Sequence, residues 1–404
     1  MSPRRILHVI NNLHLGGAET MLVQLLGRLD PDRWSPQVVS LVGGGPASEQ
    51  LESIGVPVTM IGMRRGLPGP GTFARLTRSV RRARPDLVQT WLYHSDLLGG
   101  LASRLARTRA PLIWNLRGNG PTPGRDKLTT LWTARACATV SKRVPARIVA
   151  NSRSGRQRHI ELGYDAGRIE VIPNGFDTDR FQPSDTARQT IRNELGLPPD
   201  ALLIGMAARW DPLKDFPTMI EAASRLVAVQ PRLHVLLCGP GIESSNSELS
   251  AVIESTSGDR GWSDRLHLLG RRSDMPSWQA ALDVAVLASF SEGFPNVMGE
   301  AMACGVPCVA TDAGGSAELL GDTGRLVEVG DAGALAEAVG DLLAGPPAAR
   351  RKLGRAGRER IVREFTLERM VERFEATWND VLAHSVLIRR HPHESVRAPV
   401  DRAA

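Results

Sequence analysis

The chain has 404 residues, of which 42% are hydrophobic, and it carries 50 Lys and Arg against 43 Asp and Glu. This length exceeds one ordinary hydrophobic core and fits two domains of roughly 150 to 200 residues each. The composition argues against a membrane-spanning or exported protein, because no run of about 20 apolar residues occurs and the first residues lack a signal-peptide core, so we expect a cytoplasmic protein.

The charge is divided unevenly along the chain. Residues 1–180 hold 26 Lys and Arg against 13 Asp and Glu, a net charge of +13, whereas residues 181–404 hold 24 against 30, a net charge of −6. A basic first half predicts an anionic partner, such as a membrane surface or a lipid phosphate. Nucleic acid ranks last, because aromatic residues make up only 4% and no nucleic-acid motif is present. The alternative explanation for the excess of arginine is a genome composition that favours arginine codons.

Short apolar runs alternate with helix-like patterns along the whole chain, an order typical of parallel sheets covered by helices on both faces. The predicted strands of the first half are Ile6–Ile10, Gln37–Val42, Val58–Ile61, Leu87–Trp91, Leu112–Leu116, Arg147–Ala150 and Glu170–Ile172. Those of the second half are Leu202–Ala207, His234–Cys238, Leu266–Leu269, Val284–Ala288, Cys308–Ala310 and Leu326–Val329. The sequence therefore predicts two doubly wound α/β domains.

The domain boundary is predicted from the prolines in the middle of the chain. Three prolines surround a polar, helix-like stretch within Asp179–Asp200, which marks a linker near residues 182–198. We expect an N-terminal domain at residues 1–182 and a C-terminal domain at residues 183–384, with its last helix packed back on the N-terminal domain. The polar, basic and aperiodic residues 385–404 predict a disordered tail.

The cysteines give no sign of a disulfide or of a metal site. Cys137, Cys238, Cys304 and Cys308 form no C-x-x-C pair, and no second Cys or His pair accompanies the last two. We therefore expect them to be reduced packing residues.

The first predicted strand runs into two glycines before a helix. Gly16 and Gly17 precede apolar residues at helical spacing from Met21 to Leu29. A strand, a glycine pair and a helix can present free backbone N–H groups to a phosphate. The pair alone is a weak signal, because the G-x-G-x-x-G pattern is absent and many such pairs are only turns.

Two cations follow the predicted strand Leu202–Ala207. Arg209 and Lys214 come just after its carboxyl end, the edge where open α/β sheets bind ligands. Arg209 offers a planar fork and Lys214 a compact charge, a combination suited to a departing diphosphate. Exposed cations after strands are common, so this pair also does not decide the function alone.

Two carboxylates follow the predicted strand Val284–Ala288. Pro295 favours the start of a helix, so Glu292 is expected in the preceding loop and Glu300 inside the early helix. One carboxylate could then reach a sugar and the other a ribose diol, because carboxylates accept hydrogen bonds from paired hydroxyls. Each residue alone could equally be a solvated or helix-capping charge. A further glycine pair, Gly314–Gly315, follows the next strand.

Together these residues resemble the retaining glycosyltransferases of family 4, also called glycosyl transferases group 1, which have the GT-B fold of two facing Rossmann-like domains with a cleft between them. The resemblance covers nearly the whole chain, and its motifs are specific in their order and spacing. The segments that carry it are Gly16–Glu19, Pro173–Asp177, Arg209 with Lys214, Glu292–Glu300 and Gly305–Ala310.

The resemblance implies roles at a nucleotide-sugar donor. Arg209 and Lys214 would bind the diphosphate, Glu292 the sugar hydroxyls and Glu300 the ribose, while the first glycine pair would approach from the opposite domain. The implied donor-binding set also includes the loop residues Gly293, Phe294, Pro295, Asn296 and Val297.

A histidine and two further polar residues are implied near the reacting sugar and the acceptor. His94 follows the strand Leu87–Trp91, where such enzymes often have a histidine near the transferred sugar, so we assign it to the catalytic set with Glu292, Arg209 and Lys214. A structural histidine is the alternative. Asn115 and Arg117 end another strand and are assigned to the acceptor side.

The expected reaction is transfer of a sugar from a nucleotide-diphospho-sugar, UDP-sugar favoured, to a saccharide or lipid-linked saccharide, with retention of anomeric configuration. The expected setting is synthesis of a cell-surface polysaccharide such as a capsule, lipopolysaccharide or exopolysaccharide. We expect no cofactor and no metal, because no Asp-x-Asp pair follows a strand in the manner of metal-dependent transferases.

Two alternatives stay open at this point. A nucleotide-sugar epimerase or hydrolase of the same fold would turn over the donor without an acceptor, and a non-catalytic subunit would bind the donor without turnover. We expect peripheral contact with the inner face of the plasma membrane through the basic N-terminal domain, and no nucleic-acid partner.

Overall fold

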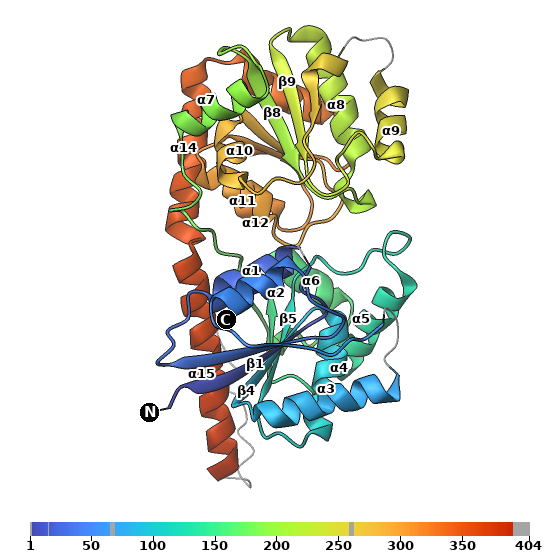
Figure 1. Ribbon diagram of the computed structural model, residues 1–404, viewed down its shortest axis with the longest axis vertical. Helices are drawn as coiled ribbons and strands as arrows, with labels where there is room; N and C mark the ends of the chain where they lie inside the picture. The colour runs from blue at the N-terminus through green and yellow to red at the C-terminus, as the bar shows by residue number, and fades with distance from the viewer. Residues whose placement is uncertain (1, 15, 65–68, 258–261, 391–404) are drawn as a thin grey trace, which may run out of the picture.

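The computed structural model describes residues 2–14, 16–64, 69–257 and 262–390, which form two α/β domains stacked end to end (Figure 1). The N-terminal domain holds a parallel sheet in the order β3-β2-β1-β4-β5-β6-β7. Its strands are β1 Arg4–Ile10, β2 Trp34–Ser40, β3 Val58–Met60, β4 Leu87–Trp91, β5 Leu112–Leu116, β6 Arg147–Ala150 and β7 Ile169–Val171. Its helices are α1 Gly17–Leu26, α2 Pro46–Ser53, α3 Pro70–Ala83, α4 Tyr93–Leu105, α5 Leu128–Val140 and α6 Arg153–Glu161, with the 3-10 turn η1 Ala166–Arg168.

The C-terminal domain holds a second parallel sheet, in the order β10-β9-β8-β11-β12-β13. Its strands are β8 Leu202–Ala207, β9 Leu233–Cys238, β10 Leu266–Leu268, β11 Val284–Leu287, β12 Cys308–Thr311 and β13 Arg325–Val327. The helices of this half are α7 Asp185–Glu194, α8 Phe216–Val229, α9 Ser247–Ser257, α10 Met275–Ala281, α11 Asn296–Ala303, α12 Ser316–Leu320, α13 Ala332–Ala344, α14 Pro347–Glu364 and α15 Leu367–Arg390, with the 3-10 turns η2 Pro212–Lys214 and η3 Ser263–Arg265.

The central strands of both sheets are buried along their whole length. Every residue of β4, β5, β8 and β11 is buried, because helices cover both faces of each sheet. Strands covered on both faces need apolar residues at successive positions without alternation. This pattern is the one that the sequence carries, and each predicted strand is present within a few residues of its predicted place.

The carboxyl edges of the two sheets face each other across the interface between the domains. In each sheet the strand order reverses beside the first strand, between β1 and β4 and between β8 and β11. Open α/β sheets bind ligands at the carboxyl ends of strands at such a switch point. In Figure 1, α1 of the lower domain and α11 and α12 of the upper domain lie between the two sheets.

Two chain segments cross between the domains side by side. The Phe176 backbone N–H donates to the Phe365 carbonyl (2.8 Å), and the Leu367 N–H donates to the Phe176 carbonyl (3.2 Å). A Cβ on Gly175 would lie 2.7 Å from the Leu367 Cα, so only glycine permits this approach. The Phe176 ring stacks against Phe294 (6.3 Å between centroids), so the chain joins the C-terminal core before residue 183, where we predicted that domain to begin.

Helix α15 returns along the N-terminal domain and runs down its side (red in Figure 1). The Trp378 indole N–H donates to the buried Gln89 Oε1 (2.6 Å), and Phe374 is fully buried in the same cluster. Arg33 and Glu375 form an ion pair at 2.7 Å at its edge. The last helix therefore joins the two domains through both apolar and polar contacts.

The predicted start of the tail at residue 385 was wrong, since α15 continues to Arg390. The apolar run at 386–388 extends a helix already formed, and adding a residue to a helix costs far less than nucleating one. The rest of the predicted tail, residues 391–404, lies outside the described residues. No helix in the described part of the chain is long and apolar enough to span a bilayer.

Candidate functional site

An ion pair joins the ends of β8 and β11 at the domain interface. Lys214 Nζ donates to Glu292 Oε1 (2.5 Å), and the Ser289 hydroxyl donates to the same oxygen (2.6 Å). The Lys214 side chain is 20% exposed and that of Glu292 is 10% exposed, so both charges are largely removed from water. The sequence placed Lys214 on a diphosphate and Glu292 on a sugar, and the structure holds the two side chains together.

Arg209 is the more exposed member of the predicted cation pair. Its side chain is 56% exposed, and its Nε donates to Asp211 Oδ2 (3.0 Å), while Asp211 Oδ1 accepts from the Leu213 N–H (3.0 Å). An exposed pair of this kind contributes little energy, so the guanidinium is free to turn toward a stronger anion. Arg209 and Lys214 therefore both follow the carboxyl end of β8, but Arg209 is held by an exposed ion pair and Lys214 by a largely buried one.

Glu19 faces this site from the other domain. It follows the first glycine pair in α1, and burial raises the pKa of its carboxyl group, while a backbone hydrogen bond and the charge of Arg209 act in the opposite direction. A Cβ added to Gly17 would lie 3.5 Å from Asn296 Nδ2 at the start of α11. The N-termini of α1 and α11 therefore meet across the interface.

Glu300 is half-buried in α11, one helical turn beyond Asn296. Burial raises the pKa of its carboxyl group to about 7, and the charge of Arg180 acts weakly against this shift. A carboxyl group with a pKa near 7 is ionised in about half of the molecules at neutral pH. Hydroxyl groups of a ligand that donate hydrogen bonds to it would favour the ionised form.

The loop before α11 fits tightly under the glycine pair that follows β12. A Cβ on Gly315 would lie 3.0 Å from the Phe294 ring, and Gly314 has a φ of +59° and abuts the Glu292 carbonyl. Across the interface, a Cβ on Gly293 would lie 2.7 Å from both the Arg117 carbonyl and Asn151 Nδ2. Only glycine at position 293 lets the two domains approach this closely.

The start of α11 keeps unpaired donors at the interface. Pro295 caps the helix, and the first N–H groups to bond within it are those of Met298 (3.2 Å) and Gly299 (3.3 Å), both to the Pro295 carbonyl. Free N–H groups and the helix dipole favour an anion at this position. The side chain of Asn296 bonds to Asn174, and Val297 is half-buried.

His94 is the second residue of α4, in the first turn after β4. The turn into the helix requires the left-handed backbone at Leu92, which has a φ of +73°, an uncommon state for a branched residue. Burial lowers the pKa of His94, and its Nε2 lies 3.5 Å from the Thr133 hydroxyl. The imidazole is therefore neutral at pH 7 and able to exchange hydrogen bonds with hydroxyl groups.

Arg117 lies between the two domains. Its guanidinium donates to Asn174 Oδ1, stacks 5.4 Å from the Trp91 ring centroid and approaches Asn115 Oδ1 at 3.5 Å. Burial lowers the pKa of Arg117 to about 9. Asn174 in turn donates to the Phe294 carbonyl (3.2 Å), so Arg117 reaches the donor loop through one intermediate residue.

Buried polar atoms without partners gather at the carboxyl edge of the N-terminal sheet. Among the described residues these atoms are Asn115 Nδ2, Arg117 Nε, Asn119 Oδ1 and Asn151 Oδ1. Leaving a buried polar group unpaired costs about 1–3 kcal/mol, which a protein retains where a ligand completes the bonds. Asn119 and Asn151 were not predicted as site residues, because no sequence pattern shows that folding brings them close to Asn115.

The chain is 30% identical to D-inositol 3-phosphate glycosyltransferase 2 of Catenulispora acidiphila over 370 residues, which cover 82% of each chain. The chain belongs to glycosyltransferase family 4. The family model described as Glycosyltransferase Family 4 matches residues 15–180, and the one described as Glycosyl transferases group 1 matches residues 199–345. The Bacillus subtilis protein EpsF is 26% identical over 317 residues, or 77% of this chain and 80% of EpsF.

Solved structures confirm the fold of this family 4 glycosyltransferase. Anabaena HepE in complex with UDP and glucose superposes with a TM-score of 0.81 at 24% identity, covering 93% of this chain and 100% of HepE. Sucrose-phosphate synthase from Thermosynechococcus elongatus superposes with a TM-score of 0.76 at 22% identity, covering 94% and 100%. The predicted GT-B architecture of two facing Rossmann-like domains is therefore confirmed.

Asn174 is a third residue of the site that was not predicted from the sequence of this glycosyltransferase. It lies in the motif Pro173–Asp177, which carried the resemblance but received no role, and it joins Arg117 to the loop before α11. Its position beside Gly175, just before the predicted linker, was the signal available in the sequence. The described residues contain no group of three or more His, Cys, Asp and Glu side chains able to hold a metal ion.

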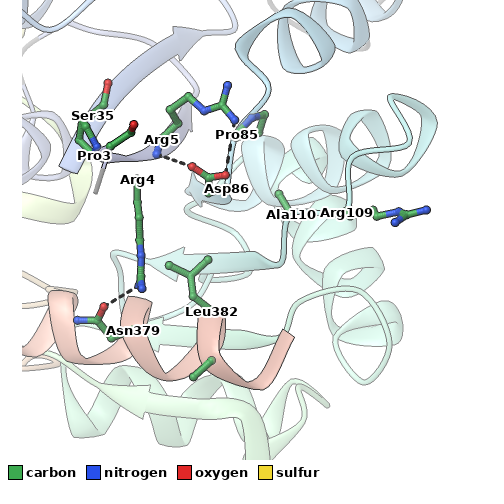
Figure 2. Close-up of a pocket in the computed structure, with 12 residues that line it drawn as sticks. Pro3, Arg4, Arg5, Ser35, Pro85, Asp86, Arg109, Ala110, Asn379 and Leu382 are labelled. Atoms are coloured by element: carbon green, nitrogen blue, oxygen red, sulfur yellow. Dashed lines mark hydrogen bonds and ion pairs between the residues drawn. The ribbon is translucent and has the colours of Figure 1, made fainter. Parts of the chain in front are cut away.

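A groove of about 1020 Å³ lies at the opposite end of the N-terminal domain, at the amino ends of its strands (Figure 2). Two of its cations are already paired, since Arg4 donates to Asn379 (2.9 Å) and Arg5 pairs with Asp86 (3.6 Å). The groove contains none of the predicted site residues, so its size does not make it the active site.

Proposed function

We propose that this glycosyltransferase moves a sugar from a UDP-sugar to a saccharide or lipid-linked saccharide, with retention of anomeric configuration and without a metal, in the synthesis of a cell-surface polysaccharide. The observation that carries the proposal is the largely buried Lys214–Glu292 pair, with Arg209 on one side and the free N–H groups of α11 on the other. This arrangement offers cationic groups to a diphosphate and a carboxylate to sugar hydroxyls.

The diphosphate would take over the cations from their present partners. Arg209 turns from Asp211 toward the phosphate oxygens, and Lys214 shares its three donors between Glu292 and the phosphate. Negative charge grows on the phosphate oxygen as the bond to the sugar breaks, so fixed cations and helix N–H groups stabilise the transition state more than the ground state. This set of groups supports a reaction without a metal.

The sugar and the nucleoside would be bound by the two carboxyl groups. Glu292, held by Lys214 and Ser289, accepts hydrogen bonds from the sugar hydroxyls, and Glu300 accepts those of the ribose diol. Neutral His94 bonds to the sugar from the N-terminal domain without placing a further positive charge beside a cation-like sugar. The UDP and UDP-glucose complexes of HepE support a uridine nucleotide as the donor.

Transfer would proceed on one face of the sugar. The acceptor hydroxyl oxygen forms the new bond to the anomeric carbon, the bond to the phosphate oxygen breaks with its electron pair on UDP, and the hydroxyl proton passes to that oxygen. The close approach at Gly293 supports domain closure that excludes water. The unpaired polar atoms of Asn115, Asn119 and Asn151 would bind the acceptor.

The acceptor is proposed to be anionic or attached to an anionic carrier. The N-terminal half carries a net charge of +13, and the relative in Catenulispora acidiphila is named for D-inositol 3-phosphate, a phosphorylated compound. A lipid-linked saccharide carries the same type of charge and would bring the protein to the inner face of the plasma membrane.

Calorimetric titration with UDP tests the donor site directly. We expect the Arg209→Ala/Lys214→Ala double variant to bind UDP at least about 100-fold more weakly, since two charge-assisted contacts are lost. The matched control is Arg225→Ala/Arg232→Ala, which removes two exposed cations away from the carboxyl edge of the sheet. Equal UDP affinity in the two double variants would overturn the assignment.

A further inference from the structure

We propose that the outer face of helices α3, α4 and α5 docks on an anionic lipid bilayer. This surface, the α3–α5 face, carries the exposed apolar residues Leu101, Leu105, Leu128 and Trp132 among basic residues. The inference rests on the proposed function only in that a lipid-linked acceptor explains its purpose; the docking itself is a separate property.

Exposed apolar side chains are concentrated on this face. Nine large apolar side chains are exposed among the described residues, and four of them belong to α4 and α5. Leu128 is 73% exposed and Trp132 is 67% exposed, and their spacing of four residues puts them on one side of α5. Leu101 and Leu105 repeat the same spacing on α4. Single exposed apolar residues are ordinary, but two such pairs on neighbouring helices mark a binding surface.

The surrounding charges are predominantly positive. Residues 70–145 hold 14 Lys and Arg against three Asp and no Glu; of these, Arg117 lies at the domain interface and Asp96 is fully buried. Arg104 lies between the two leucines of α4, and Arg135 approaches the Trp132 ring at 6.0 Å from its centroid. On α3, Arg78 and Arg82 are exposed at helical spacing. A positive, apolar face is complementary to anionic head groups above acyl chains.

The three helices form one continuous layer. Helix α4 packs between α3 and α5, and Figure 1 shows all three on the same side of the N-terminal sheet. Arg81 donates to the Leu105 carbonyl (3.3 Å), and Arg104 donates to the Arg143 carbonyl beyond the end of α5 (3.3 Å). The exposed residues of α3, α4 and α5 can therefore contact one surface together.

The face reaches the edge of the interdomain site. Thr133, next to Trp132, lies against His94, and Arg125, just before α5, stacks 3.5 Å from the centre of the Phe290 ring of the C-terminal domain. An acceptor head group held at the bilayer surface beside α5 would enter the site past these residues. Docking would therefore present the acceptor side of the cleft to the membrane.

Sedimentation with lipid vesicles tests the docking on the full chain. We expect binding to phosphatidylglycerol vesicles, with little binding to phosphatidylcholine vesicles. Two variants should each lower the partition coefficient at least about 10-fold: Leu128→Ala/Trp132→Ala and Arg78→Gln/Arg82→Gln/Arg104→Gln. Each apolar side chain inserted into the bilayer and each cation near its surface contributes a factor on the order of five or more to the partition coefficient. Vesicle binding by the variant that lacks the three arginines should also lose most of its dependence on salt concentration.

Matched controls lie on the C-terminal domain. Val229→Ala/Val362→Ala removes two exposed apolar side chains, and Arg351→Gln/Lys352→Gln/Arg355→Gln removes three exposed cations. Both controls should bind vesicles as wild type does. Equal loss in controls and α3–α5 variants, equal binding to neutral and anionic vesicles, or no binding at all would overturn the proposal.

Two further measurements separate the possible causes of failure. Titration with UDP reports on the donor site independently, so a protein that binds UDP but no vesicle contradicts the docking alone. Binding of an RNA oligonucleotide that competes with vesicles and is unaffected by Leu128→Ala/Trp132→Ala would assign the face to polyanions in general, and would also overturn the proposal.

Discussion

Replacing Glu300 by glutamine should stabilise the protein at alkaline pH. Burial raises the pKa of this carboxyl group from 4.5 to about 7, so the folded protein holds its proton over a pH range in which the unfolded chain has released it. The free energy of unfolding therefore falls as pH rises from about 4.5 to about 7. A pKa raised from 4.5 to about 7 lowers the free energy of unfolding by about 3 kcal/mol at pH 8 and by less than about 1 kcal/mol at pH 5.

Urea unfolding at pH 5 and pH 8 measures this difference. Glutamine keeps the shape and removes the charge, so Glu300→Gln should unfold at a higher urea concentration than wild type at pH 8, with most of the gain lost at pH 5. Glu359→Gln, which neutralises an exposed carboxylate on α14, is the control and should give no comparable pH-dependent gain. Equal gains in stability at both pH values would show that burial of the carboxylate charge is not what raises the pKa of Glu300.

The same variant tests the role of Glu300 at the ribose. A ribose diol donates to the ionised carboxylate, so UDP binding should release a proton near pH 7, and UDP affinity should rise between pH 6 and pH 8. Calorimetry in buffers of different ionisation enthalpy measures the proton release. In Glu300→Gln both effects should vanish and UDP affinity should fall. Wild-type affinity in the variant would show that Glu300 does not contact the ligand.

Three further substitutions test the rest of the site and the frame around it. Lys214→Met should lower kcat about 100-fold, as expected for loss of a transition-state donor, and single-turnover assays should locate the loss in the chemical step. Gly293→Ala should lower kcat by preventing closure, because its methyl group meets the opposite domain, whereas Gly43→Ala, with no atom within 4 Å, should leave kcat and Tm unchanged. Trp378→Ala should destabilise the protein by about 3–5 kcal/mol in urea, since it removes a fully buried ring of α15; a smaller loss would mean that α15 contributes little to the N-terminal core.

The strands were predictable because their signal is local. Each buried strand needs a short continuous apolar run, and the runs at Leu87–Trp91 and Leu202–Ala207 coincide with β4 and β8. The end of the last helix was not predictable in the same way. Residues after His384 look polar and basic in composition, but the helix is already formed by packing through Phe374 and Trp378 and continues past that point.

The candidate site was predictable in part for a similar reason. Residues that closely follow a strand, such as Arg209 and Glu292, are placed by the topology alone, because the carboxyl ends of parallel strands lie at one edge of the sheet. The contacts of Asn174 and Arg117 depend on how the two domains approach each other. No pattern within either half of the sequence specifies that approach, so Arg117 received an acceptor role and its link to Asn174 was missed.

A donor screen with product detection tests the central claim most directly. Purified protein is incubated with UDP- and GDP-sugars, with and without a lipid extract as acceptor, and products are identified by mass spectrometry and by NMR of the anomeric proton. We predict release of UDP together with a glycosylated product of retained configuration, only when acceptor is present, and none from Arg209→Ala/Lys214→Ala. Turnover of a UDP-sugar at the same rate without acceptor, or donor binding with no turnover under any condition, would contradict the account.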